Sequence, residues 1–487
     1  MTQEQLEEKR RAELAARRKA AKLRAKKLKK RRRRIAFGGL IGILVLVLLA
    51  LIYSLRGGSG NKEGEKTGTA DGKTPSVTAA DTATPVPTET PTPTPTPSPT
   101  PSVVSMVAVG DNLYDWYMLE DGWDGEDSFD FDDNYDNIRK YVEMADFAVV
   151  NQECPIGGDE GYQGSGTEWD YIGERNRWGS YHGYSNFNSP DACGDALVKA
   201  GFNVVTMATN HVSDFGLLAL NNSIKYWNTK QGVTLLGIHD SEESQNQITV
   251  LEKYGIRIAC LNYTYGTNND SAKDEASYCI DYLSEERVKS DTAKARELGV
   301  DFIVVFVHWG TEYNMDVSSY QETYTKIFLD AGVDAVIGAH PHIVEPMEWF
   351  TREDGSRMVV YYSLGNFISM FKDKRCELEG MAYLEFYKGE DGTYLKEGSI
   401  IPLVNHWNYD SSVLGSRKNF TVYAMQDYTE ALAKEHGCVN FSAGSGFSYS
   451  YITELAKKMW GDNIKTVDWS TVTAADRSTG TGAGEGE

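Results

Sequence analysis

Two histidines stand close together in the second half of the chain. A short apolar run, 335–337, predicts a buried strand, and Gly338 and the segment His340-Pro341-His342 follow it. Residues two apart on an extended segment point to the same side, and the proline favours extended backbone around it. We therefore expect both imidazoles to reach one metal ion or two adjacent ions. The pair alone is a weak signal, so this prediction depends on ligands from other segments.

Metal-capable side chains also follow four other apolar runs that predict strands. These runs are 103–111, 145–153, 202–211 and 302–307. Because ligands in α/β sheets bind outside the carboxyl ends of the strands, we expect these side chains to meet at one edge. The candidate ligands are Asp111, Glu153, Asn210, His211, His308, His340 and His342. Carboxylate, amide and imidazole donors favour one or two divalent ions of Mn, Fe or Zn, and two ions about 3.5–4 Å apart can bind a phosphoryl group and activate water.

Apolar runs alternate with helical patterns over residues 103–404. Helices are expected at 191–200, 215–231, 284–298 (beginning with Ser284 as its cap) and 320–331. Further strands are expected at 234–238 and 358–363, and 248–252 with 256–263 predict a hairpin. This alternation predicts an α/β layered domain over 103–404. The signal weakens in the extension 405–487, where short helices at 429–435 and 452–460 precede an end expected to be disordered. The Gly- and aromatic-rich stretch 157–188 interrupts the alternation and is either a substrate-facing loop or a surface insertion.

The first 55 residues predict a membrane anchor. Residues 1–34 hold 16 Lys and Arg against 4 Glu, and residues 35–55 are 21 residues without a charge. As a helix, this uncharged stretch is about 31 Å long, enough to cross the hydrocarbon core. The basic flank predicts a single-pass protein of the cell membrane with a cytoplasmic N-terminus and an extracytoplasmic main domain. The alternative is a cleaved signal peptide, whose apolar region is shorter and ends at a small-residue cleavage site.

Residues 56–102 predict a linker between the anchor and the folded body. The stretch begins rich in Gly, Ser and Lys and becomes a Thr-Pro repeat. Such a repeat cannot pack a core and favours polyproline II. We therefore expect a disordered stalk that holds the body away from the membrane.

The charge of the body excludes one class of function. The whole chain carries −21, and removing the +12 of residues 1–34 leaves −33 for the rest. A nucleic-acid-binding role is excluded for the body because no basic surface is available in bulk. The six cysteines are scattered without C-x-x-C spacing and predict neither a zinc knuckle nor a dense disulfide framework.

A series of motifs runs through about 300 residues, from 103 to 404. They read GDN (110–112), NQECPI (151–156), FNSP (187–190), MATNHVSDFG (207–216), VHWGTEY (307–313), GAHPHIVEPME (338–348) and YSLGNFI (362–368). In order and spacing, this series resembles the poly-gamma-glutamate capsule synthesis (CapA) family. That family is similar to calcineurin-like metallophosphatases. The resemblance implies a metallophosphatase-like α-β-β-α sandwich, here preceded by one transmembrane helix and a Pro/Thr-rich linker.

The resemblance also implies roles for the candidate ligands. Asp111 would bind one metal ion and Glu153 would bridge two. The remaining positions would be filled by Asn210, His308, His340 and His342, with His211 beside Asn210 acting as a general acid or phosphate contact. Two departures from the phosphatase pattern stand out: Leu113 replaces the histidine of Asp-x-His, and Glu153 replaces a bridging aspartate. They leave open whether two metal ions bind and whether hydrolysis occurs.

Seven further residues are candidates for supporting the ligands or holding substrate. They are Asn112, Asn151, Asp214, Glu312, Asn366, Arg175 and Arg177. Asp214 either orients a histidine or caps the helix that follows, and Glu312 either lines the rim of the site or caps the next helix. Asn366 belongs to a tight turn and is a candidate partner of a ligand. The two arginines either hold an anionic substrate or lie on the surface.

These patterns lead to two main hypotheses about function. The first is a membrane-anchored, extracytoplasmic, metal-dependent hydrolase of capsule or poly-gamma-glutamate biosynthesis, acting on a phosphoester or on the polymer's own amide bond. The second is a non-catalytic subunit that binds polymer or joins an export or assembly complex. A wall-bound nucleotidase or phosphodiesterase is a weaker third reading. The expected partners are the membrane, other capsule synthesis or export proteins and an anionic envelope polymer, which the acidic body repels unless metal ions or a basic groove intervene.

Overall fold

The computed structural model describes residues 101–124, 128–158, 183–184, 186–411 and 416–470. The predicted basic segment 1–34, transmembrane helix 35–55, nearly all of the linker and the chain end from 471 lie outside the described residues. Arg175 and Arg177 lie outside them too. Within the described ranges, no helix combines the length and apolar character needed to cross a membrane.

The first sheet has eight strands and contains both parallel and antiparallel pairs. Four of its strands are parallel and lie side by side in this order: β1 (Ser102–Asn112), β2 (Phe147–Gln152), β3 (Val204–Thr206) and β4 (Thr234–Leu236). On the other side of β1 follow the antiparallel strands β12 (Leu378–Gly389), β13 (Gly392–Asp410) and β14 (Ser416–Ala424). The short β11 (Asn366–Ile368) pairs with the end of β1. The carboxyl ends of β1 and β2 therefore lie next to each other.

The second sheet has six strands in the order β5-β6-β7-β8-β10-β9. Its four central strands are parallel: β6 (Ile256–Thr264), β7 (Phe302–His308), β8 (Ala335–Ala339) and β10 (Arg357–Tyr361). Antiparallel β5 (Thr249–Lys253) and β9 (Met347–Thr351) form the edges. Every residue of β7 is buried, which explains its uninterrupted apolar sequence, since both faces of the strand are covered.

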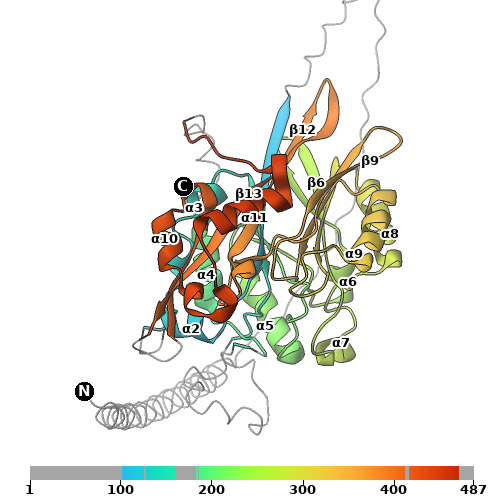
Figure 1. The fold of residues 1–487 in the computed structure, drawn as a ribbon. Helices are drawn as coiled ribbons and strands as arrows, with labels where there is room; N and C mark the ends of the chain where they lie inside the picture. Colours follow the sequence, from blue (N-terminus) through green and yellow to red (C-terminus); the bar gives the residue numbers. More distant parts are fainter. Residues whose placement is uncertain (1–100, 125–127, 159–182, 185, 412–415, 471–487) are drawn as a thin grey trace, which may run out of the picture. The chain divides into compact units, whose positions relative to one another are not determined.

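Alternate residues of β7 belong to two different apolar cores. Phe302, Val304 and Phe306 join the large core that also takes in the eight-stranded sheet. Ile303 and Val305 join a second core with residues of α8 (Glu285–Glu297) and α9 (Ser319–Asp330). These two helices cover the outer face of the second sheet (Figure 1).

The remaining helices complete the body. Helices α4 (Asp191–Ala200) and α5 (Gly216–Asn228) contribute to the large core with the parallel half of the first sheet. The other helices are α2 (Trp116–Gly122), α3 (Arg139–Val142), α6 (Glu242–Asn246), α7 (Ser271–Glu275), α10 (Glu430–Glu435) and α11 (Tyr449–Trp460). The α/β prediction is confirmed as a mixed fold of two sheets with flanking helices, and Ser284 caps α8 as predicted.

Two predictions about segments leading to the site need correction. The strand predicted over 202–211 is β3, which ends at Thr206. The amides of Met207 and Ala208 donate to the Asn262 side chain of the other sheet, so the chain leaves the ladder there. The segment after β8 is not extended either, as described below.

The C-terminal part belongs to the same body. The long β12–β13 hairpin was not indicated by the sequence patterns, and the predicted domain end at 404 falls inside β13. Beyond it, Trp407, Phe420, Ile452 and Trp460 are buried in the large core. The predicted short helices exist as α10 and α11, but α11 begins earlier than expected, at Tyr449. All six cysteines are buried free thiols.

Candidate metal centre

Five of the predicted ligands converge where the two sheets meet. Asp111 lies near the end of β1 and Glu153 directly follows β2, while His308 ends β7 and His340 and His342 follow β8. Strand register brings them level, because Asp111 pairs with Asn151 and His308 pairs with Ala339. All five residues are at most 4% exposed. The carboxyl ends of parallel strands in both sheets thus supply one buried site.

Glu153 is shared by two sets of potential ligands. One set is Glu153, His308 and His340, and the other is Asp111, Glu153 and His342; within each, the ligand atoms lie within 4.8 Å of one another. Glu153 Oε1 lies 3.7 Å from His308 Nε2 and 3.9 Å from His342 Nε2. This arrangement suits two adjacent ions with a bridging carboxylate.

Several atoms of this site that could bind a metal ion have no hydrogen-bond partner. Both carboxylate oxygens of Glu153 and Nδ1 of His340 are buried without a hydrogen-bond partner. A buried, unpaired carboxylate costs several kcal/mol, and native structures rarely leave one. Divalent cations of Mn, Fe or Zn fit this mixed oxygen and nitrogen donor set. The residues present therefore fit a metal centre, while the metal's identity is not specified by them.

The electrostatics of the imidazoles favour ligation. Burial, with the neighbouring His340 and His342, lowers the pKa of His308 well below 6.5, and burial lowers the pKa of His340 to about 3. Both rings are therefore neutral and offer a lone pair. Burial and the charge of Asp111 raise the pKa of Glu153 to about 8. Burial opposes protonation of His342, but Glu153 and Asp111 together raise its pKa to about 9. A bound cation would displace these protons.

The histidine pair sits on strained backbone rather than on the predicted extended segment. His340 has φ +104° and His342 has φ +58°, in the region that side-chain-bearing residues rarely adopt. Each such residue costs roughly 1–3 kcal/mol. The His340 amide donates to Asp111 Oδ2 at 3.2 Å, and the carbonyl of Pro341 accepts from the Tyr313 amide at 2.8 Å. These hydrogen bonds hold the backbone so that His340 belongs to one ligand set and His342 to the other.

Neighbouring amides orient the ligands. Asn151 Nδ2 donates to Asp111 Oδ1 at 2.7 Å and lies 3.4 Å from His308 Nδ1. Asn366 Oδ1 lies 3.0 Å from His342 Nδ1, and its Nδ2 donates to the His342 carbonyl at 3.0 Å. Both residues therefore support ligands directly, as carboxamides commonly do around metal sites.

Asn210, His211 and Asp214 form the next part of the site. Asn210 Oδ1 lies 2.9 Å from His308 Nε2, so this side chain lies beside the ligand sets. His211 Nδ1 lies 2.8 Å from Asp214 Oδ2. Asp214 also accepts the Phe187 amide at 2.8 Å, while the residue at the start of α5 makes no side-chain cap. Of the two predicted roles of Asp214, the structure shows the one that orients a histidine.

Other predicted site residues lie differently. Asn112 turns away, donating to Gln152 and accepting from Tyr135. Leu113, at the position of the missing histidine, packs in a small apolar cluster with Cys154 and Phe187. Glu312 is exposed, and its charge contributes to the raised pKa of Glu153; α9 is capped by Ser318 instead. Glu312 thus belongs to the rim.

One contributor was missed by the sequence analysis. Asn268 lies in the segment after β6, with its Nδ2 3.3 Å from His211 Nε2 and its amide donating to the Asn210 carbonyl at 2.8 Å. The rule that found the other residues applies here too, because polar residues follow the carboxyl end of a predicted strand. The hairpin reading of β5 and β6 drew attention to the opposite end of that strand.

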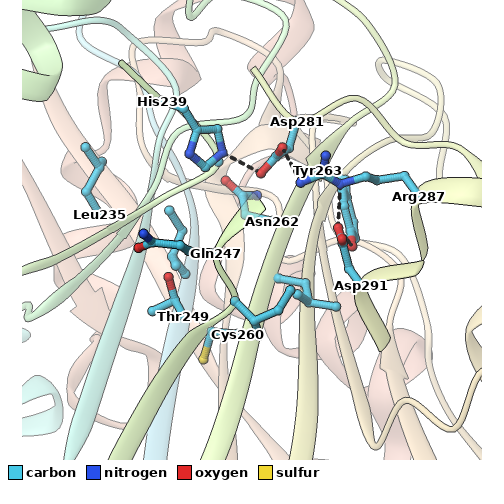
Figure 2. A pocket seen from close by; sticks show the side chains of 14 residues that line it. Leu235, His239, Gln247, Thr249, Cys260, Asn262, Tyr263, Asp281, Arg287 and Asp291 are labelled. Atoms are coloured by element: carbon cyan, nitrogen blue, oxygen red, sulfur yellow. Dashed lines mark hydrogen bonds and ion pairs between the residues drawn. The ribbon is translucent and has the colours of Figure 1, made fainter. Parts of the chain in front are cut away.

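A polar cavity of about 30 Å³ lies elsewhere, between β4, β5, β6 and α8 (Figure 2). Asp281 lies 2.8 Å from His239 and 3.2 Å from Arg287, which also contacts Asp291 at 2.5 Å. The volume suits about two waters, and both aspartates are paired with Arg287. We therefore assign this network to fastening the loop 265–284 that carries Asn268.

A third buried set, Glu377, His436 and Cys438, lies in the C-terminal part. His436 Nε2 lies 2.8 Å from the Asn405 carbonyl oxygen, and His436 Nδ1 accepts the Cys438 amide at 3.1 Å. Burial lowers the pKa of His436 to about 3, so the ring is neutral. Because backbone groups occupy both ring nitrogens, we assign no metal to this set.

Comparison with known proteins now identifies the family. A model of the bacterial capsule synthesis protein PGA_cap matches residues 105–370. The chain belongs to this family. The matched segment contains every candidate ligand described above, so the resemblance seen in the motifs is confirmed.

Two CapA proteins of Bacillus species are similar to the chain over part of its length. The chain is 27% identical over 213 residues to the capsule biosynthesis protein CapA of Bacillus anthracis, covering 43% of this chain and 49% of that protein. It is 25% identical over 263 residues to the PGA biosynthesis protein CapA of Bacillus subtilis strain 168, covering 53% and 63%. The match thus spans about half of the first relative and 63% of the second.

Among solved structures, a calcineurin-like phosphoesterase of Bacillus subtilis is similar in fold. It is 16% identical, with a TM-score of 0.36, over 62% of this chain and 91% of that one.

Proposed function

We propose that this capsule synthesis family member is a membrane-anchored, extracytoplasmic, divalent-metal-dependent hydrolase, with phosphoesters as the first substrate class to test. The observation that carries the proposal is the Glu153 carboxylate. It is fully buried, lacks any hydrogen-bond partner and is shared by two sets of ligand-capable side chains. A purely structural carboxylate at this place would be paired.

The ligands divide between two ions. Asp111, Glu153 and His342 would hold one, and Glu153, His308 and His340 the other, with Asn210 beside His308. When bound, such ions supply Lewis acidity toward a phosphoryl oxygen and activation of water. Asn151 and Asn366 keep Asp111 and His342 in the orientation that this requires.

His211 is placed to move a proton. Its Nδ1 faces Asp214, and its Nε2, which lies 3.3 Å from Asn268 Nδ2, would meet a substrate oxygen. Burial disfavours the charged ring, but the hydrogen bond and charge of Asp214 outweigh burial and raise the pKa of His211 above 6.5. A histidine that keeps its proton near neutral pH can donate it to a leaving oxygen as a general acid.

Elemental analysis and hydrolysis of bis(p-nitrophenyl) phosphate test this proposal on the full-length chain purified in detergent. We expect close to stoichiometric Mn, Fe or Zn, and turnover that falls about 100-fold or more in His211→Ala while metal content is kept. The matched control is His406→Ala, since His406 is equally buried but contacts the Tyr428 hydroxyl in the C-terminal part. Absence of metal would overturn the proposal.

The location and partners are proposed from the sequence outside the described residues. Residues 35–55 would form the anchor, and the partners would be the membrane, other capsule synthesis or export proteins and an anionic envelope polymer. Protease added to intact cells whose wall has been removed should digest the body and spare residues 1–34. A body that is fully protected would contradict this orientation.

A second candidate is a non-catalytic, polymer-binding or assembly subunit. The observation that favours it lies at the first strand, where Asn112 turns away and Leu113 is buried among apolar side chains, so no imidazole joins from there. Full metal content with no turnover on phosphoesters or on polyglutamate would favour this candidate.

A further inference from the structure

Two tyrosines combine an exposed ring with direct contact to the metal-site imidazoles. The Tyr265 ring centroid lies 4.7 Å from that of His340, and the Tyr313 centroid lies 5.9 Å from that of His342. Their exposed fractions are 42% and 40%, although the histidines beneath are nearly inaccessible. Each tyrosine therefore lies between one ligand set and the solvent.

The backbone holds both tyrosines in place. The Tyr265 amide donates to the His308 carbonyl at 3.0 Å. Tyr313 has φ +59°. Two hydrogen bonds keep it in this conformation: the Tyr313 amide donates to the Pro341 carbonyl, and Arg375 Nη1 donates to the Tyr313 carbonyl at 3.2 Å. The Tyr313 ring also contacts Phe371 at 5.8 Å. Strain of this kind collects at functional sites, and rigid rings lose little entropy on binding.

The charge around these tyrosines does not suit an anionic chain. Glu312, an exposed acid, precedes Tyr313 in the sequence. Its charge contributes to the raised pKa of both Tyr265 and Tyr313. Arg375 is engaged by Asp373 at 2.7 Å. An aromatic and acidic mouth favours an uncharged flat group over further carboxylates.

We propose that Tyr265 and Tyr313 form a subsite for a ring, a nucleobase or a sugar, attached to the phosphoryl group that the metal centre binds. This subsite rests on the proposed function and specifies its substrate class. Stacking on an aromatic side chain strengthens binding of such a ring by about 10-fold or more. A flexible polyglutamate chain has no ring to place there.

Phosphonates separate the ring from the phosphoryl group. Metal-loaded full-length protein is titrated calorimetrically with methylphosphonate and with phenylphosphonate. We expect phenylphosphonate to bind about 10-fold more tightly. Tyr265→Ala and Tyr313→Ala should each reduce this preference while leaving methylphosphonate affinity unchanged, and Tyr265→Phe should retain it. The control is Tyr394→Ala, an equally exposed tyrosine (46%) on β13.

The outcomes distinguish the two proposals. Equal affinity for both phosphonates in the unmodified protein would overturn the ring subsite and leave the phosphoryl site intact. Binding of neither would overturn both. Loss of methylphosphonate affinity in Tyr265→Ala and Tyr313→Ala would assign the tyrosines to the integrity of the metal centre and overturn the subsite. Comparison of glucose 1-phosphate with AMP then tells a sugar from a nucleobase.

Discussion

Glu153 belongs to both ligand sets, whereas His340 belongs to one. This difference gives the two side chains different weight in metal binding. In Glu153→Ala, both ions lose a ligand and the remaining groups no longer balance the charge, so we predict near-complete loss of metal. In His340→Ala, we predict a fall from about two ions to about one. Elemental analysis after gel filtration measures both.

The matched control for this pair is His406→Ala. His406 is as buried as the site histidines, but its Nδ1 contacts the Tyr428 hydroxyl at 2.8 Å in the C-terminal part. Metal content should not change in that variant. Full metal content in His340→Ala would mean that the strand-end cluster has been assigned the wrong role.

A buried carboxyl outside the site makes stability depend on pH. Burial raises the pKa of Glu345 from 4.5 to about 8, although Gln321 donates to it at 2.5 Å. Between these values the folded state binds more protons than the unfolded state, so stability falls as pH rises. The native chain should lose roughly 3–4 kcal/mol of stability between pH 5 and pH 8 through this carboxyl, and we predict that Glu345→Gln removes this loss.

Urea unfolding at pH 5 and pH 8 measures the Glu345 effect, with exposed Glu353→Gln as the control. If the native chain and Glu345→Gln lose stability equally between these pH values, the carboxyl is ionised in the folded protein and the prediction fails.

The turn from β8 into the ligand segment depends on the absence of a side chain at Gly338. A Cβ there would lie 2.0 Å from the Tyr362 carbonyl oxygen and 2.5 Å from Trp309 Nε1. These two atoms are bonded to each other at 2.9 Å, and the Gly338 carbonyl accepts from the Leu364 amide. We predict that Gly338→Ala costs roughly 3 kcal/mol or more and lowers metal content, because β8 and β10 must separate.

Chemical denaturation and elemental analysis test the Gly338 prediction together. Gly266→Ala is the control, since a Cβ there meets nothing within 4 Å. A Gly338→Ala chain with native stability would show that the close approach of these strands is not required.

The C-terminal strands and helices complete the large core, and so they decide which fragment folds. β13 pairs with β12, which pairs with β1, the strand that carries Asp111. Ending the chain at 404 removes several buried aromatic side chains, each worth about 1.5–3 kcal/mol. We predict that a fragment 101–404 lacks a cooperative urea transition, whereas 101–470 has one. A native-like transition in the shorter fragment would contradict this.

Elements with local sequence signals were predicted well, whereas elements that depend on distant partners were not. Helix α4 was predicted with its observed bounds, and α8 with its Ser284 cap, because apolar periodicity and capping are local. The β12–β13 hairpin was not predicted, because its partners lie far away in the chain and sheet pairing is not written in a local pattern. β3 was predicted too long because the bonds that end it come from Asn262.

The ligand types and their strand-end positions followed from the sequence alone, because the carboxyl ends of parallel strands gather in one place whatever the details of packing. Tertiary structure decided how the ligands are divided. The positive φ values of His340 and His342 turn these neighbours toward different ligand sets, and such strain persists only where distant partners hold it. Asp111 and Asn366 supply those partners, from strands of the other sheet. The sharing of Glu153 and the outward rings of Tyr265 and Tyr313 likewise exist only where the two sheets meet.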